Sequence, residues 1–303
     1  MADTQFLALA QLGEQLEATT KRVEKASLLA GLLEQLSPEE LPPTVRLTIG
    51  QVFPEWDARA LNVSWKAVMA VVDGLADAPP PVRDEIWGQA VDGGEAVRLL
   101  LERGRSQPPA PPPLTILGVY GTFEEIAATA GRGSRTRKEE LLRGLLVRAS
   151  AVEAKYRAKI IYQDMRHGVS EGIMLDGIAR AAGAKAKLVR RANQFWGDVG
   201  EVALVALTEG EPGLARASLR LFRPFKPMLA QTASNLQEAW ERHPGGLALE
   251  YKLDGARVQI HRQGDQVRIY SRSLADVTTS LPDVAGVVRE KLAADEAILE
   301  GEA

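Results

Sequence analysis

The chain has 303 residues, a length typical of about two domains, and its 45% hydrophobic and 25% charged residues fit a globular protein with a hydrophobic core. Its 37 Lys and Arg stand against 40 Asp and Glu, a net charge of −3 that excludes a uniformly basic protein. Cysteine is absent and only three histidines occur, which excludes disulfides, Cys-ligated zinc and a Cys nucleophile; we predict no metal site built from the protein alone. No apolar run reaches the roughly 18 residues of a membrane span, and the start MADTQFLALAQLGEQ does not resemble a signal peptide, so we expect a cytoplasmic protein without membrane contact.

The first two thirds of the chain read as helical. From Thr4 to about Ala217, apolar residues recur at intervals of three and four. One such face holds Leu28, Leu29, Leu32, Leu33 and Leu36. The sequence Ser37-Pro-Glu-Glu40 then offers an N-cap, a proline for the first turn and two acids. Further on, we predict one long helix over Arg137–Asp164 and another over Ile173–Ala182, ending at Gly183.

The chain has two proline-rich stretches, and we assign one to a loop inside a domain and the other to a linker between domains. Gln107–Pro113 cannot be helical. Because apolar residues recur at helical spacing on both sides of it, we favour a loop inside one domain over an interdomain linker. Leu221–Ala230, with two prolines three residues apart, is the predicted linker.

After the linker the pattern changes to strands. We predict strands over Leu247–Lys252, Ala256–Arg262 and Gln266–Arg272, with Gln263-Gly264-Asp265 as the hairpin turn between the last two. A short helix over Asp283–Ala293 and a strand over Ala297–Glu302 complete the chain.

The segment Glu250-Tyr-Lys-Leu-Asp-Gly-Ala-Arg257 carries the strongest chemical signal. A strand delivers Lys252 to a turn at Asp254 and Gly255, and arginines at 257 and 272 can hold phosphate oxygens in a bidentate fork. A lysine nucleophile must be neutral to attack, and neighbouring cations disfavour its protonation. On these residues alone, a surface hairpin with solvated Lys and Arg side chains is the favoured interpretation, because a Lys-x-Asp-Gly tetrapeptide is a weak signal.

Several motifs together resemble a known family. Lys252-Leu-Asp-Gly-Ala-Arg257 resembles the Lys-x-Asp-Gly-x-Arg motif of ATP-dependent DNA ligases. Phe225–Ala230, Tyr270–Ser273 and Leu299–Glu302 are similar to the start of that family's adenylation domain and to its second and third motifs. Arg166-His-Gly-x-x-Glu-Gly172 is similar to a helical stretch of the ligase DNA-binding domain, so the resemblance covers nearly the whole chain.

The resemblance implies a fold class and two domains. It implies a mainly α DNA-binding domain over residues 1–222, followed over 223–303 by the start of an α+β, ATP-grasp-like covalent nucleotidyltransferase (adenylation) domain. The family's later motifs and its OB-type domain have no counterpart before Ala303. We therefore expect a fragment or truncated chain that seals no nicks and self-adenylates poorly.

The resemblance also implies a reaction and its residues. Lys252 would attack the α-phosphate of ATP and form a lysyl–AMP, and AMP would then pass to the 5′-phosphate of a nick, where the 3′-hydroxyl displaces it. Glu250 would recognise adenine, Arg257 and Arg272 would bind ribose and phosphate, and Glu302 would accept from a ribose hydroxyl. The implied cofactors are ATP and Mg²⁺. The implied partner is nicked double-stranded DNA in replication, repair and recombination at the nucleoid, with a sliding clamp as a further candidate and a monomer as the expected state.

Three alternatives stay open. An RNA ligase or capping-type guanylyltransferase shares the lysine motif but usually lacks a long helical domain before it. An NAD-dependent ligase lacks this helical domain as well. A catalytically inactive module that binds double-stranded DNA is the alternative from a different class.

Charge is unevenly distributed along the helical region. Residues 131–191 contain 15 Lys and Arg against 6 Asp and Glu, a local charge of +9. We predict that this segment contacts the phosphates of duplex DNA without reading its sequence, and the residues chosen for this role are Lys185, Lys187, Arg190 and Arg191. Arg132, Arg135, Arg137 and Lys138 form a second basic cluster, and solvated helix faces are the alternative for both.

The remaining chemistry-bearing side chains are assigned to structure. We expect His167 to be a surface or capping residue and His261 to be an ordinary surface histidine. The five tryptophans are assigned mainly to helix packing; they are Trp56, Trp65, Trp87, Trp196 and Trp240.

Overall fold

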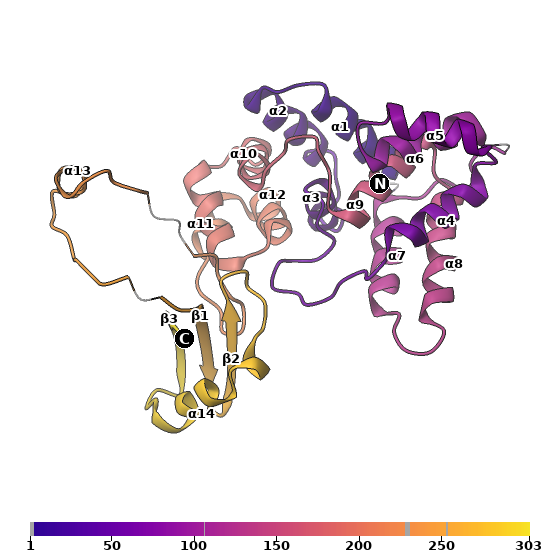
Figure 1. Ribbon diagram of the computed structural model, residues 1–303. Coiled ribbons are helices and arrows are strands. Elements are labelled where there is room, and N and C mark those ends of the chain that lie inside the picture. The colour runs from indigo at the N-terminus through magenta and orange to yellow at the C-terminus, as the bar shows by residue number, and fades with distance from the viewer. Residues whose placement is uncertain (1–2, 106, 228–230, 253) are drawn as a thin grey trace. The chain divides into compact units, whose positions relative to one another are not determined.

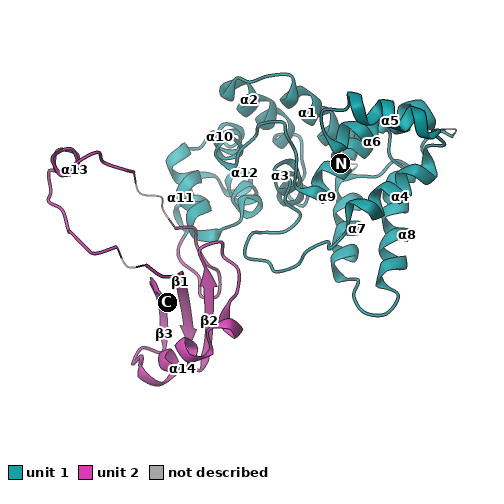
Figure 2. Cartoon of the chain, viewed as in Figure 1, with its two compact units in different colours: residues 1–217 teal, residues 218–303 magenta. Residues whose placement is uncertain are grey.

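The computed structural model describes residues 3–105, 107–227, 231–252 and 254–303, and it divides into two compact units, residues 1–217 and 218–303 (Figure 2). Unit 1 is helical and unit 2 holds a small antiparallel sheet, which confirms the predicted fold class of a mainly α region followed by the start of an α+β region. Residues 228–230 of the predicted linker, and Leu253 beside Lys252, lie outside the described residues. In the described ranges, no helix combines the length and the apolar composition needed to cross a bilayer.

Unit 1 consists of helices, with the longest connection, residues 49–64, between α3 and α4 (Figure 1). They are α1 Phe6–Glu17, α2 Arg22–Leu33, α3 Leu41–Thr48, α4 Trp65–Leu75, α5 Pro80–Gln89, α6 Gly93–Gly104, α7 Ile116–Ala128, α8 Ser134–Val147, α9 Ala151–Tyr162, α10 Glu171–Ala181, α11 Ala186–Trp196 and α12 Val199–Ala215. The stretch Gln107–Pro113 lies between α6 and α7 inside this unit, so it is a loop and not an interdomain linker.

The predicted long helix over 137–164 is wrong in one respect, because it is two helices. Helix α8 ends at Val147, and a capping box at Ser150 begins α9. The Ser150 side chain accepts from the Glu153 backbone N–H at 3.3 Å, and Glu153 Oε2 accepts from the Ser150 N–H at 2.9 Å. These two bonds satisfy donors that a new helix start leaves free, so the chain turns between α8 and α9. The predicted helix over 173–182 is confirmed as α10.

One continuous hydrophobic core fills unit 1. Leu29, Leu33 and Leu36 of the predicted leucine face are buried in it. Helix α1 packs on α9 at Gly13, where a Cβ atom would lie only 2.2 Å from the Tyr156 ring. Glycine at this position therefore lets the two helices approach closely, and α9 becomes the central helix of the unit.

Unit 2 contains a three-stranded antiparallel sheet of order β2-β1-β3, formed by β1 Arg257–Gln263, β2 Gln266–Ser271 and β3 Glu296–Glu302. Gly264, with φ +56°, makes the hairpin turn that the sequence predicts. Helix α14, Pro282–Lys291, covers one face through a small core that includes Val258, Ile260 and Val288. The strands predicted over 256–262, 266–272 and 297–302 are thus confirmed.

The predicted strand over Leu247–Lys252 is wrong. These residues have no regular secondary structure, and Leu249 and Tyr251 are 77% and 96% exposed. Both edges of β1 are occupied, by β2 and by β3, so the segment has no place beside the strand that follows it. Just before it, α13 (Leu236–Arg242) has no buried residue, and Trp240 is exposed instead of packed as predicted.

Candidate active site

Three of the predicted site residues meet at one end of the sheet in unit 2. Arg257 begins β1 and pairs in register with Glu302, the last residue of β3. Arg272 directly follows Ser271, the end of β2, which pairs with Val258. Antiparallel pairing therefore brings two guanidinium groups and a carboxylate to the same sheet end from positions up to 45 residues apart.

Glu300 also belongs to this end of the sheet, and sequence reasoning missed it. The Arg257 Nη2 lies 2.7 Å from Glu300 Oε2, and both side chains are partly exposed. The signal was available, because residues two apart on a strand share a face and Glu300 is two residues before Glu302. Arg257, Arg272 and Glu300 line one small pocket together with Phe225 and Pro227.

The Asp-Gly turn is tied to the end of β3. Ala256 and Ala303 exchange two backbone hydrogen bonds of 3.0 Å each. A Cβ atom at Gly255 would lie 2.9 Å from the Ala303 carbonyl oxygen, so only glycine fits this approach without a shift. These two bonds position Arg257 at the start of β1, whereas residues 247–252 lie outside the sheet.

Lys252 and Glu250 are not brought to the sheet end. Both are exposed on the irregular segment before the Asp-Gly turn, and neither makes a hydrogen bond or ion pair with the residues that the structure describes. The amine of Lys252 is therefore accessible to a ligand, five residues before Arg257 in the chain. The described residues also contain no group of three or more His, Asp and Glu that could hold a metal ion.

His261 is buried, so its predicted surface position is wrong. Its ring packs edge-on against Tyr270, with centroids 5.1 Å apart, and Nδ1 accepts from the Phe222 backbone N–H at 2.8 Å. Burial lowers the pKa of His261 to about 4, so the ring is neutral near pH 7. The prediction failed because the linker residues 222–225 cover this face of β1, and sequence alternation alone does not show such cover.

His167 is buried as well, which corrects the prediction of a surface residue. Its Nε2 donates to the Thr48 carbonyl at 2.7 Å, and its Nδ1 accepts from the Val169 N–H at 3.2 Å. Burial lowers the pKa of His167. His167 thus caps the carbonyl of Thr48, the last residue of α3, as the capping alternative predicts. The Arg-His-Gly turn thereby connects the segment before α10 to the end of α3.

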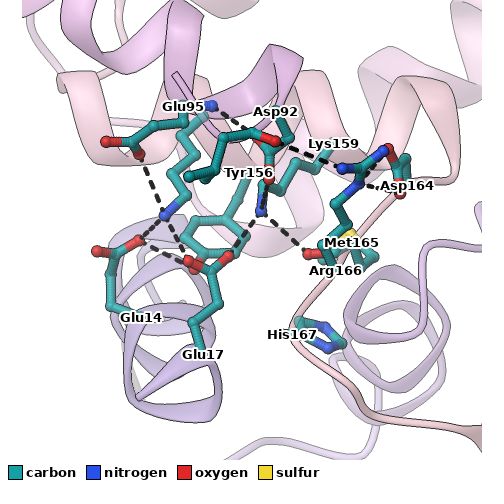
Figure 3. Close-up of polar contacts among 12 residues, drawn as sticks. Glu14, Glu17, Asp92, Glu95, Tyr156, Lys159, Asp164, Met165, Arg166 and His167 are labelled. Atoms are coloured by element: carbon teal, nitrogen blue, oxygen red, sulfur yellow. Dashed lines mark hydrogen bonds and ion pairs between the residues drawn. The ribbon is translucent and has the colours of Figure 1, made fainter. Parts of the chain in front are cut away.

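Part of the basic charge in residues 131–191 is internal. Lys155, Arg157 and Lys159 of α9 are at most 3% exposed. Lys155 Nζ lies 2.6 Å from Glu14 Oε1 and 2.7 Å from Glu17 Oε2, the two α1 carboxylates that are labelled in Figure 3. Lys159 Nζ lies 2.7 Å from Glu17 Oε1 and 2.9 Å from Asp92 Oδ2. These lysines therefore connect α9 to α1 and to the start of α6 instead of facing solvent.

Two carboxylates of this ion cluster, Glu17 and Asp92, have lowered pKa values. Burial opposes the charge on Glu17, but hydrogen bonds from Lys155 and Lys159 outweigh it, so the pKa of Glu17 falls below its ordinary value. For Asp92, burial raises the pKa and the hydrogen bond from Lys159 lowers it, and the net result is a pKa below the ordinary value. Both lysines thus have carboxylate partners within unit 1, and neither is left as a free cation for a ligand.

The four basic residues predicted to contact DNA lie on or beside α11 and are exposed: Lys185, Lys187, Arg190 and Arg191. Lys185 Nζ is 3.6 Å from Glu211 Oε2, and Arg190 pairs with Asp176. Arg191 lies over the Phe195 ring, 5.2 Å from its centroid, and Lys187 makes no ion pair with the described residues. In the second basic cluster, Arg135 and Arg137 pair with glutamates, which reduces its net charge.

Comparison with known proteins identifies relatives of both units. Residues 5–179 match the family described as DNA ligase N terminus, and residues 227–303 match the ATP dependent DNA ligase domain. The chain is 39% identical over 297 residues to a DNA ligase of Thermococcus fumicolans, covering 98% of this chain and 53% of the relative. It is 42% identical over 300 residues to a DNA ligase of Methanopyrus kandleri and 39% identical over 303 residues to one of Methanothermobacter thermautotrophicus, covering 98% and 100% of this chain and 54% of each relative. The chain thus spans about half the length of the curated relatives it matches.

Proposed function

Because the chain belongs to the ATP-dependent DNA ligase family, we propose that it contributes the nucleophile and part of the nucleotide site of a nick-sealing reaction. The neutral amine of Lys252 attacks the α-phosphorus of ATP, the N–P bond forms, and the bond to pyrophosphate breaks. AMP then passes to the 5′-phosphate of a nick, and the 3′-hydroxyl displaces AMP to form the phosphodiester.

The sheet end in unit 2 carries this proposal. Arg257 and Arg272 present guanidinium forks that suit phosphate and ribose oxygens, since the planar donor pairs match such acceptors. Glu302, in register with Arg257, accepts from a ribose hydroxyl. Arg257 then sits where it neutralises charge on the α-phosphate, while Phe225 and Pro227 provide an apolar wall beside it.

The two exposed residues before the Asp-Gly turn complete the proposed set. In this proposal Glu250 recognises adenine and the exposed amine of Lys252 supplies the nucleophile. Mg²⁺ is proposed to accompany the triphosphate, because such ions are bound through substrate phosphates and water with few protein ligands. Its chemistry would be to neutralise charge on the phosphates during transfer.

Nicked duplex DNA is the proposed partner of unit 1. The exposed cations on α11 support it, because phosphate contacts suit a protein that must bind any sequence. Action in DNA replication, repair and recombination at the nucleoid follows from this substrate, and a sliding clamp remains a proposed partner of an otherwise monomeric protein.

A chimera tests the proposal. The 303 residues are joined to the carboxyl-terminal part of the Methanothermobacter thermautotrophicus ligase, which aligns over the whole chain. With ATP and Mg²⁺, the chimera is expected to form a covalent AMP adduct and to seal a nicked duplex. Lys252→Ala and Lys252→Arg should both abolish the adduct, the second because a guanidinium stays protonated.

Lys291→Ala, which removes an exposed lysine on α14, is the matched control and should leave both steps intact. An adduct that persists in Lys252→Ala contradicts the proposal. DNA binding without any adduct in the unmodified chimera would favour the alternative of a non-catalytic DNA-binding module.

A further inference from the structure

A hydrogen-bonded network fastens the linker to the sheet of unit 2. The Phe222 backbone N–H donates to His261 Nδ1 at 2.8 Å, and the Phe222 carbonyl accepts from the Tyr270 hydroxyl at 3.1 Å. Three residues further, the Phe225 N–H donates to Gln259 Oε1 at 3.0 Å. Two strand residues on one face of β1 therefore hold the backbone that leads into the pocket wall at Phe225.

The same network continues to the proposed nucleotide residues. His261 Nε2 donates to Gln259 Oε1 at 2.9 Å, and Gln259 Nε2 donates to Glu300 Oε1 at 3.3 Å. The other oxygen of Glu300 accepts from Arg257 at 2.7 Å. The bonds form an unbroken chain from the linker backbone through His261, Gln259 and Glu300 to the guanidinium of Arg257.

The two inner residues of this hydrogen-bond network, Gln259 and His261, are shielded from water. His261 is 0% exposed and Gln259 is 5% exposed. The His261 ring must be neutral, because Nδ1 accepts while Nε2 donates, and its low pKa agrees with that state. Each polar atom of Gln259 has a partner, so the orientation of its amide is fixed by the network.

We propose that Gln259 and His261 are positioning residues of the nucleotide pocket. Gln259 itself lines the pocket beside Arg257 and Glu300, and its amide orients Glu300 and, through it, Arg257. His261 acts through Gln259, and the two residues together hold the backbone from Phe222 to Phe225 at the pocket wall. This inference rests on the proposed function, and it assigns a role to two buried polar residues that packing alone leaves unexplained. Buried polar residues next to a binding site can orient the side chains that contact the ligand.

Two substitutions separate the two ends of the network. His261→Asn keeps an oxygen acceptor near the position of Nδ1 for Phe222 and loses the donor to Gln259. Gln259→Glu keeps the acceptor for Phe225 and His261 but places a carboxylate beside Glu300, which should turn Glu300 away from Arg257 by like-charge repulsion. His261→Ala removes both links.

The experiment measures ATP affinity and amide hydrogen exchange on the chimera described above, which supplies the rest of the nucleotide site. His261→Ala and Gln259→Glu should each weaken ATP binding about tenfold. Exchange of the Phe222 amide should speed up about tenfold in His261→Ala, return toward the original rate in His261→Asn, and stay unchanged in Gln259→Glu. Val267→Ala, buried on the opposite face of β2, is the control for general loss of stability and should leave ATP affinity unchanged.

The outcomes are distinct. Unchanged ATP affinity in His261→Ala and Gln259→Glu would overturn the positioning role while leaving the proposed function intact. An equal loss in Val267→Ala would also overturn it, because the effect would then be one of stability. Absence of ATP binding in the unmodified chimera would contradict the proposed function, and the positioning role with it. Should His261→Ala fail to fold, Gln259→Glu and the Phe222 exchange rate of the unmodified chimera still decide the question.

Discussion

The two units of this chain use charged residues in opposite ways. In unit 1, Lys155 and Lys159 are buried among carboxylates that arrive from two other helices (Figure 3). In unit 2, Arg257, Arg272 and Glu302 stand exposed at a sheet end that a small core supports. Saturated, buried ion pairs define how helices pack, whereas exposed and convergent charges remain available to a ligand. Counting charges in a sequence does not distinguish these two uses.

The largest effect is expected from breaking the buried cluster. Lys159→Ala leaves Asp92, whose side chain is 5% exposed, without its lysine and removes one of the two lysine partners of Glu17. It should therefore lower the free energy of unfolding of unit 1 by about 3–5 kcal/mol. Urea denaturation followed by the fluorescence of the tryptophans in unit 1 measures this loss. A loss below about 1 kcal/mol would mean that the cluster resembles an exposed ion pair, and the comparison between the units would fail.

Reversing the exposed cations of unit 1 should affect binding instead of folding. The variant changes four residues to Glu: Lys185, Lys187, Arg190 and Arg191. Its affinity for duplex DNA should fall about 100-fold at low salt on every sequence, and the salt dependence should flatten, because fewer counterions are released. Fluorescence anisotropy with a labelled duplex at several salt concentrations measures both quantities.

A smaller pair of variants controls for net charge. Lys187→Glu with Arg191→Glu should weaken binding about tenfold. Arg83→Glu with Arg103→Glu, at partly exposed positions of α5 and α6, should leave it nearly unchanged. Equal effects of the two pairs would place the DNA surface elsewhere on unit 1.

The buried histidine of unit 2 should make that unit sensitive to acid. The pKa of His261 is about 4 in the folded chain and about 6.5 when unfolded, so the unfolded state binds the proton more readily. The contribution of the neutral His261 ring to the free energy of unfolding is complete above pH 6.5. It decreases by on the order of 2 kcal/mol as the pH falls toward 4. Amide exchange in β1 between pH 7 and 4.5 reports this change, and His261→Gln should remove that part of the pH dependence. A pH profile unaltered by the substitution would contradict the burial of a neutral ring.

The smallest effect sharpens the contrast within unit 1. Arg22 pairs with Asp176 at 2.7 Å, but its side chain is 60% exposed. Arg22→Ala should lower the free energy of unfolding by less than about 1 kcal/mol, because water screens such a pair. Urea denaturation of Arg22→Ala beside Lys159→Ala tests the ranking directly, and equal losses would contradict the distinction between exposed and buried pairs.

Local sequence patterns predicted much of the fold. Periodicity located α10, and alternation with a Gly-Asp turn located the β1–β2 hairpin, because both depend on neighbours in the chain. The Ser-x-x-Glu signature at 150–153 was equally local, and overlooking it caused the error of one long helix. For the site, the motif spacing placed Arg257, Arg272 and Glu302 in one domain, and the sheet register brings them together.

The features that depend on distant residues were not predictable in this way. Lys155 and Glu14 are 141 positions apart, so the sequence could not show that this cation is buried. The cover of His261 by Phe222 and the exclusion of residues 247–252 from the sheet both depend on which segments compete for β1. Glu300 was missed because the motif pattern emphasised Glu302 and left out the other residue on the same strand face.

In the proposed ligase reaction, the exposed lysine before the Asp-Gly turn, and no other lysine of unit 2, carries the nucleotide. Unit 2 has three lysines, Lys226, Lys252 and Lys291, and peptide mapping by mass spectrometry of the ATP-treated chimera tells them apart. The account predicts AMP on Lys252 alone, in an acid-labile phosphoramidate bond that forms only with ATP and Mg²⁺. AMP on Lys226 or Lys291, or a modification independent of Lys252, would contradict it.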